Sequence, residues 1–171
     1  VTQIDYLQNT AGFPIYTGSV AKYLSPGEAK FETLLEELEK AEKYIFLEYF
    51  ILARGKMWNA IHDVLRRKAQ EGVEVRIIFD DFGSIKRQRR DFLTRLKGDG
   101  IEVSVFNPIY PIFNNFINNR NHRKIVVIDG RIAMTGGVNI GDEYINRQKR
   151  FMHLIIRATN NESRIIIRLL Q

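Results

Sequence analysis

Residues 44–52 read YIFLEYFIL, an apolar run interrupted by Glu48, and two further apolar runs follow, VEVRIIF at 73–79 and IEVSVF at 101–106. Such runs, rich in β-branched and aromatic residues, are typical of buried strands. Between them, apolar residues recur with helical spacing over Met57–Glu71, and Arg87–Lys97 is expected to form a short, very basic helix. This alternation predicts an α/β fold, with a mixed, largely parallel sheet flanked by helices on both faces.

The residues before the first strand predict another helix. Ser25-Pro26-Gly27-Glu28 is typical of a helix start with Ser25 as N-cap, and the apolar residues that follow recur every three or four positions. The remaining face is acidic, so we expect an amphipathic helix. No repeat or long linker divides the 171 residues, so we expect a single domain over 1–171.

The composition excludes several kinds of chemistry. Without cysteine there is no thiol nucleophile, disulfide framework or Cys-based zinc site, and the three histidines lie far apart in the sequence. We therefore expect chemistry without a metal or other cofactor. The net charge of +6 favours an anionic partner, whether nucleic acid, a phosphorylated substrate or lipid headgroups. No apolar run reaches the roughly 18–20 residues of a bilayer span, and no signal peptide opens the chain, so we expect a soluble chain.

The segment 118–144, NNRNHRKIVVIDGRIAMTGGVNIGDEY, predicts a hairpin. Asp129-Gly130 is a strong two-residue turn signal, which sets Ile128 opposite Arg131 and Lys124 opposite Thr135. Strand alternation then places the side chains of His122 and Lys124 on one face, roughly 6–7 Å apart. Asp129 falls on the other face, where it shapes the turn or supports the strand.

This segment gathers groups suited to a phosphoryl ligand. It offers an imidazole as nucleophile or base, a fixed cation, two glycines that leave open space, and the amide of Asn139 as a neutral donor. A His beside a Lys on a strand is, by itself, more often a surface or core pair. The candidate site therefore depends on the whole spacing His122-x-Lys124-x4-Asp129-x6-Gly136-Gly137-x-Asn139.

That spacing resembles the HKD motif of the phospholipase D superfamily. The stretches FLEYFI at 46–51, EGVEVRIIFDDFGS at 71–84 and GGVNIGDEY at 136–144 resemble bacterial cardiolipin synthases within it. The resemblance implies a phospholipase D-like fold and catalytic residues His122, Lys124 and Asp129, with Gly136, Gly137 and Asn139 as substrate-binding residues. It also implies a phosphatidyltransferase that converts phosphatidylglycerol to cardiolipin and glycerol through a phosphohistidine, as part of phospholipid biosynthesis. For the full-length protein it implies the cytoplasmic face of the cell membrane.

Two departures from the family pattern shape the expected activity. The superfamily uses two motifs and this sequence has one, so we expect a second half from a missing C-terminal region or from a dimer partner. The family's aromatic-rich segment after GDEY, whose carboxylate orients the histidine, is replaced by residues with no acid between Glu143 and Glu162. This chain is therefore expected to be the N-terminal half of a two-motif enzyme, inactive alone.

Two other functions remain open. A homodimeric superfamily nuclease or phosphodiesterase would also suit the basic charge, and the isolated piece could be an inert folded module. Tyr110, Phe113 and Phe116, in a loop just before the motif, favour lipid over nucleic acid, so we do not expect a nucleic-acid partner.

Overall fold

The computed structural model describes residues 2–14, 19–84, 90–109, 119–146 and 165–168. Its elements in chain order are α1 (Gln3–Asn9), β1 (Val20–Tyr23), α2 (Gly27–Glu39), β2 (Tyr44–Tyr49), α3 (Lys56–Gln70), β3 (Glu74–Asp80), α4 (Asp81–Ser84), α5 (Arg90–Gly98), β4 (Glu102–Phe106), β5 (Lys124–Ile128), β6 (Ile132–Thr135), the 3-10 turn η1 (Asp142–Ile145) and β7 (Ile165–Arg168). Tyr110, Phe113 and Phe116, the aromatic residues expected in the loop before the motif, lie outside the described residues.

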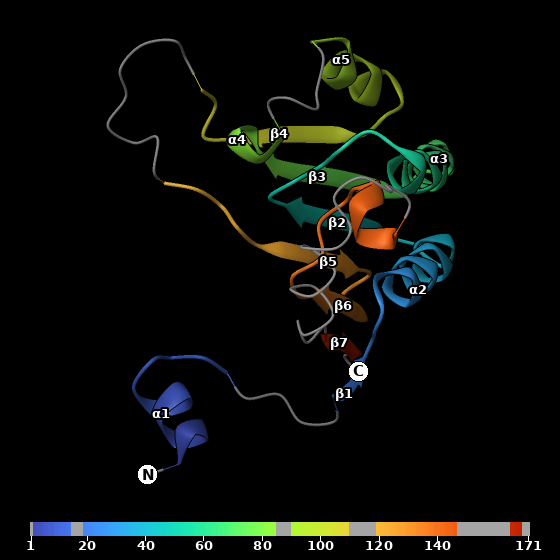
Figure 1. The fold of residues 1–171 in the computed structure, drawn as a ribbon. Coiled ribbons are helices and arrows are strands. Elements are labelled where there is room, and N and C mark those ends of the chain that lie inside the picture. The colour runs from blue at the N-terminus through green and yellow to red at the C-terminus, as the bar shows by residue number, and fades with distance from the viewer. Residues whose placement is uncertain (1, 15–18, 85–89, 110–118, 147–164, 169–171) are drawn as a thin grey trace.

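The strands form one mixed sheet in the order β1-β7-β6-β5-β2-β3-β4 (Figure 1). β2 pairs in parallel with β3, and β3 with β4, as the strand–helix alternation predicts. The other described pairings are antiparallel: β2 with β5, β5 with β6, β6 with β7, and β7 with β1. The α/β class with a mixed sheet is confirmed. The expectation of a largely parallel sheet is corrected, since parallel pairing is confined to β2, β3 and β4.

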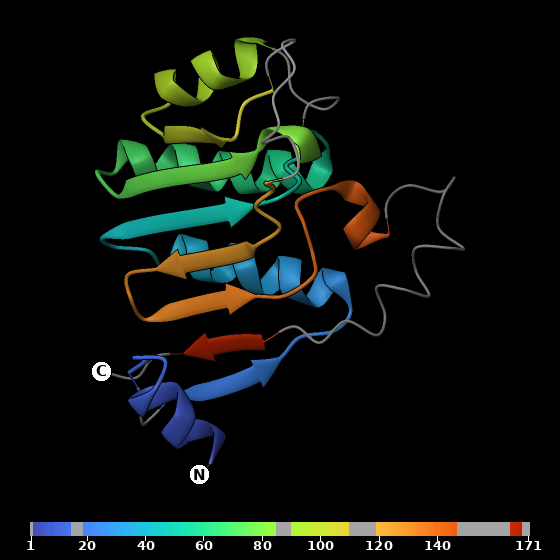
Figure 2. The ribbon, with the colours of Figure 1, turned by 90° about the vertical axis from the view of Figure 1, so that its left-hand side faces the viewer.

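The helices α2 and α3 cover one face of the sheet, and in Figure 2 they lie behind the strands. Alternate residues of β2, Ile45, Leu47 and Tyr49, are buried on that face, and Val126 and Ile128 of β5 continue the same core. Within the described residues no helix lies over the other face of β2, β3 and β5, which we call the open face. The sequence predicted helices on both faces of the sheet, whereas the described helices cover only one face of β2, β3 and β5.

The hairpin is shifted by one residue from the predicted pairing. Ile128 pairs with Ile132, and Ile125 rather than Lys124 pairs with Thr135. Asp129 and Gly130 adopt positive φ, as a tight turn demands, but Arg131 joins the loop as an extra residue. The predicted pairing would have put Arg131 beside Ile128 on the core face. The observed one buries Ile132 there instead, and a slip of one residue exchanges the faces of a whole strand.

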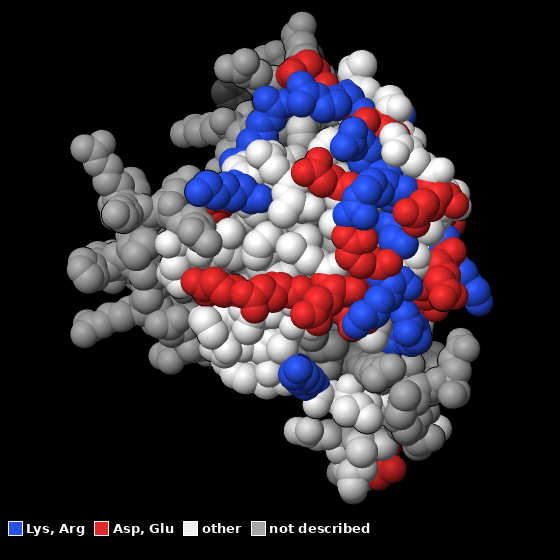
Figure 3. Space-filling model, turned by 90° about the vertical axis from the view of Figure 1, so that its right-hand side faces the viewer, with Lys and Arg blue, Asp and Glu red and all other residues white. Residues whose placement is uncertain are grey.

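The helix boundaries differ slightly from prediction. α2 begins after Pro26, which occupies the N-cap position, and no side chain caps it, so Ser25 is not the N-cap. Its acidic outer face is confirmed: Glu32, Glu36 and Glu39 are exposed, and acidic side chains form a band across the helical side of the molecule (Figure 3). α3 starts at Lys56, where Asp142 accepts hydrogen bonds from the first backbone N–H groups.

Candidate active site

The candidate site lies at one edge of the sheet. The chain leaves β2, β3 and β6 at this edge and enters β5 there, so four segments that are distant in sequence come together (Figure 2). In sheets with parallel strands, the carboxyl ends are where loops converge to build sites. His122 and Lys124 come from the entry to β5, and Asn139 follows β6.

His122 and Lys124 meet around the ring of Phe50, the first residue after β2. The His122 ring centroid lies 4.7 Å from that of Phe50, at an interplanar angle of 58°. The Nζ of Lys124 lies 5.5 Å from the same centroid and donates a hydrogen bond to the carbonyl oxygen of His122 at 2.6 Å. The imidazole is exposed, whereas the lysine side chain is buried. The structure therefore brings these two predicted residues together.

The backbone that carries Phe50 is held from two sides. The Oδ1 of Asn139 accepts a hydrogen bond from the backbone N–H of Ile51, and the Oγ of Ser84 accepts one from that of Leu52. A side chain at Gly83 would collide with the carbonyl oxygen of Phe50, so only glycine permits this approach. Sequence analysis did not single out Phe50, because it lies inside the apolar run 44–52 that was expected to be a buried strand.

Asn139 is buried, and its amide is already engaged. Beyond its bond to Ile51, its Nδ2 donates to the hydroxyl of Tyr144 in η1 at 2.9 Å. The amide nitrogen carries a second N–H, so ligand contact remains chemically available. Gly136 has φ of 148°, a value that favours glycine, and both it and Gly137 are partly buried. The ligand space expected beside these glycines stays a prediction.

Asp129 lies at the opposite end of β5 from His122. Its Oδ1 accepts hydrogen bonds from the backbone N–H groups of Lys43 and Tyr44, and its Oδ2 from that of Glu42. Partial burial acts to raise the pKa of Asp129, but these backbone donors outweigh it and hold the pKa below its ordinary value. The structure thus separates Asp129 from the other motif residues and gives it the supporting place that strand alternation predicts. The catalytic role that the motif implies for Asp129 stays a prediction.

Beneath the site, a second buried lysine went unnoticed in the sequence. The Nζ of Lys30 in α2 donates to the carbonyl oxygen of Val138 at 3.2 Å and lies 3.5 Å from the hydroxyl of Tyr49. Burial raises the pKa of Tyr49 well above its usual range. Tyr49 is also the strand partner of Lys124 in the pairing of β2 with β5. Lys30 was not a candidate residue because a lysine on an amphipathic helix is expected to be exposed to solvent.

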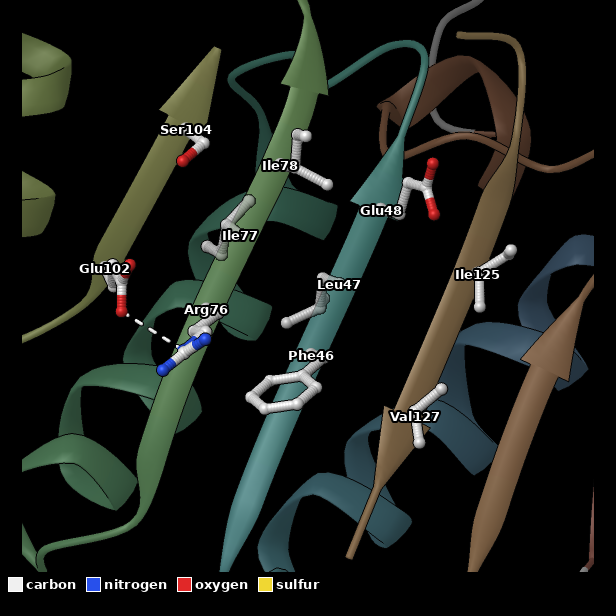
Figure 4. A pocket seen from close by; sticks show the side chains of 10 residues that line it. All are labelled: Phe46, Leu47, Glu48, Arg76, Ile77, Ile78, Glu102, Ser104, Ile125 and Val127. Carbon is white, nitrogen blue, oxygen red and sulfur yellow. Dashed lines mark ion pairs between the residues drawn. The ribbon is translucent and has the colours of Figure 1, made fainter. Parts of the chain in front are cut away.

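A cavity of about 300 Å³ lies on the open face (Figure 4). Apolar side chains from β2, β3 and β5 line its floor, with Glu48 at one end and the ion pair of Arg76 and Glu102 at the other. Lys124 points to the helical face, so this cavity is separate from the His122–Lys124 pair. Among the described residues, no group of three His, Cys, Asp or Glu side chains converges to hold a metal ion.

The model of the phospholipase D-like domain of cardiolipin synthase matches residues 34–166, most of the chain. This chain belongs to that family. The cardiolipin synthase of Oceanobacillus iheyensis is 42% identical to this phospholipase D-like domain over 146 residues, 85% of the chain and 28% of that protein. The probable cardiolipin synthase YwiE of Bacillus subtilis is 41% identical over 143 residues, 83% of the chain and 28% of that protein.

The likeness to a solved structure concerns the fold of the phospholipase D-like domain. NUC from Salmonella typhimurium, a phospholipase D family member, gives a TM-score of 0.56 at 16% identity over 89% of this chain and 82% of that one. The chain spans less than a third of the two curated relatives named above. No helix within the described ranges is both long and apolar enough to cross a membrane.

Proposed function

We propose that this phospholipase D-like domain is one catalytic half of a phosphatidyltransferase that converts two molecules of phosphatidylglycerol to cardiolipin and glycerol. The other half, with a second motif, comes from the rest of a longer polypeptide or from a second copy. The observation that carries the proposal is the meeting of the His122 imidazole and the buried Lys124 ammonium at Phe50. We expect the reaction to take place at the cytoplasmic face of the cell membrane, where the enzyme has access to its lipid substrate.

The reaction divides into two displacements at phosphorus. One motif imidazole attacks the phosphorus of the first phosphatidylglycerol, and the bond to the headgroup glycerol oxygen breaks with its electron pair on that oxygen. The imidazolium of the second motif gives that oxygen its proton, and glycerol leaves. A hydroxyl of the second phosphatidylglycerol then attacks the phosphohistidine, returns a proton to the second imidazole and releases the first. His122 fills one of these two roles.

Lys124 supplies fixed positive charge for this chemistry. A lysine buried at 3% exposure has few alternative solvent partners, and a charge in such surroundings acts on a nearby phosphate more strongly than one in water. Its Nζ contact to the His122 carbonyl ties the cation to the residue that carries the imidazole. The ammonium is therefore in place before a phosphodiester arrives, so no reorganisation is needed during the reaction.

The test compares this chain with the longest polypeptide that contains it, each incubated with phosphatidylglycerol in detergent micelles. The longer polypeptide should form cardiolipin and glycerol, and His122→Ala should abolish the product. His62→Gln is the matched control, because His62 pairs with Asp99 at 2.8 Å and stacks on Trp58, away from the site. We expect no turnover from the chain alone.

Three results would contradict the proposal in different ways. Turnover by this chain as a monomer would refute the need for a second motif. Cardiolipin formation that survives His122→Ala would remove the residue from the chemistry. DNA cleavage without lipid turnover would favour the nuclease alternative, and DNA binding should then fall steeply with salt.

A further inference from the structure

The imidazole-bearing segment enters β5 from outside the sheet. β5 begins at Lys124, so ladder hydrogen bonds do not hold the exposed His122. Two carboxylates, Asp80 and Glu48, contact the residues on either side of it. The catalytic chemistry above uses neither of them.

Asp80, the last residue of β3, holds the backbone of this segment. Its side chain has no exposed surface. The Oδ2 accepts a hydrogen bond from the backbone N–H of Asn121 at 3.0 Å, and the Oδ1 accepts one from the guanidinium of Arg120 at 3.2 Å. The backbone N–H of Phe82 also donates to Oδ1, at 2.9 Å. A buried carboxylate persists only when its oxygens are satisfied in this way, so its direction is closely defined.

Glu48 holds the side chain of the same asparagine. It extends from β2 on the open face, at the end of the cavity that lies nearer the site (Figure 4). Its Oε1 accepts a hydrogen bond from the Nδ2 of Asn121 at 2.5 Å, and the guanidinium of Arg123 lies 3.7 Å from the same oxygen. Asn121 is thus hydrogen-bonded through its backbone to Asp80 of β3 and through its side chain to Glu48 of β2.

We propose that Asp80 and Glu48 are positioning residues for His122. By fixing Asn121 at two points, they set the direction in which the following imidazole leaves the backbone, although neither touches the reacting phosphate. The inference rests on the proposed function for its catalytic consequence, but not for its structural one. Displacements of about 1 Å at a reacting group can reduce rates by about a hundredfold, so even partial loosening is measurable.

The test uses the Glu48 series, because Glu48 is partly exposed and its variants should fold. Glu48→Ala removes both contacts, whereas Glu48→Gln retains an oxygen that can accept from Asn121. Glu102→Ala is the matched control, since Glu102 lines the same cavity but pairs with Arg76 at 3.1 Å. Amide hydrogen exchange of this chain is measured first. Exchange at Asn121 should rise about tenfold in Glu48→Ala, stay near wild type in Glu48→Gln and Glu102→Ala, and leave the β5 amides unchanged.

Turnover of phosphatidylglycerol is then measured on the longer polypeptide. Glu48→Ala should lower kcat about tenfold with KM unchanged, and Glu48→Gln should restore most of it. Equal exchange at Asn121 in Glu48→Ala and Glu102→Ala, or equal loss of kcat in Glu48→Ala and Glu48→Gln, would overturn the positioning role. Loosening of Asn121 in a polypeptide that turns over no lipid would refute the proposed function and leave the positioning of the segment supported.

Discussion

Replacing Asp129 by Asn should weaken the join between β5 and the start of β2. The wild-type carboxylate accepts three backbone hydrogen bonds, from Glu42, Lys43 and Tyr44. Asparagine keeps one oxygen, so it can retain the two bonds to Oδ1 but loses the bond from Glu42 and the charge behind all three. Asparagine also tolerates the positive φ of 54° at this position, so no backbone strain is added.

The magnitude follows from those contacts. A hydrogen bond to a charged group contributes about 1.5–3 kcal/mol and a neutral one about 0.5–1.5 kcal/mol. Losing one charged bond and neutralising two would sum to roughly 4 kcal/mol, and the partial solvent access of Asp129 reduces this to about 2 kcal/mol. Urea denaturation at pH 7 measures the difference in the free energy of unfolding. Asp63→Asn is the control, since that carboxylate is 67% exposed and lies 3.9 Å from Arg66.

The pH dependence gives a second check on Asp129. Its folded-state pKa is lowered, so its contribution is fully present above the unfolded pKa of about 3.9 and is lost as the pH falls through the lower folded value. The difference in the free energy of unfolding between the wild type and Asp129→Asn should therefore become smaller as the pH falls. Equal destabilisation by Asp129→Asn and Asp63→Asn at pH 7, or a gap that widens in acid, would refute the reasoning.

Three other substitutions test neighbouring contacts. Asp142→Ala leaves two backbone N–H groups at the start of α3 without their carboxylate and should cost about 1–2 kcal/mol in urea denaturation. Tyr49→Phe removes the hydroxyl beside Lys30 and should cost about 1 kcal/mol. Compared with this variant by ultraviolet titration, the wild type should show a phenol, that of Tyr49, which ionises only on alkaline unfolding. Gly83→Ala forces a methyl against the carbonyl of Phe50 and should cost about 1–3 kcal/mol in the same assay, while a neutral effect would mean that this approach is not tight.

The parts of the fold that follow from local pattern were predictable. The runs at 44–52, 73–79 and 101–106 each contain a strand, β2, β3 and β4, although β2 ends at Tyr49. The helices between them lie within a few residues of the predicted ranges. The hairpin pairing was not predictable from its turn. Asp129-Gly130 fits a two-residue loop, and the preference for burying Ile132 instead of Arg131 is a property of the assembled core.

The candidate site divides in the same way. Strand alternation predicts the common face of Lys124, Val126 and Ile128, which the structure confirms. The supporting place of Asp129 followed from the same alternation. Phe50 and Lys30 could not be predicted as part of the site, because their partners there, His122 and Val138, lie many residues away in the sequence.

The surroundings of His122 show the physical reason why strand alternation does not set the direction of every side chain at the site. Alternation is a rule of extended backbone, and it ceases to constrain a side chain once ladder pairing ends; here the described ladder ends at Lys124, two residues later. The contacts around His122 come from other parts of the chain: the ring of Phe50 lies against the imidazole, and the carboxylates of Asp80 and Glu48, about 40 and 70 residues earlier, hold the preceding Asn121. If His122 has the proposed catalytic role, its place just outside the sheet lets long-range contacts rather than strand alternation set the direction of its side chain. Lys124, by contrast, is the first residue of the paired strand β5, where strand alternation sets the direction of its side chain.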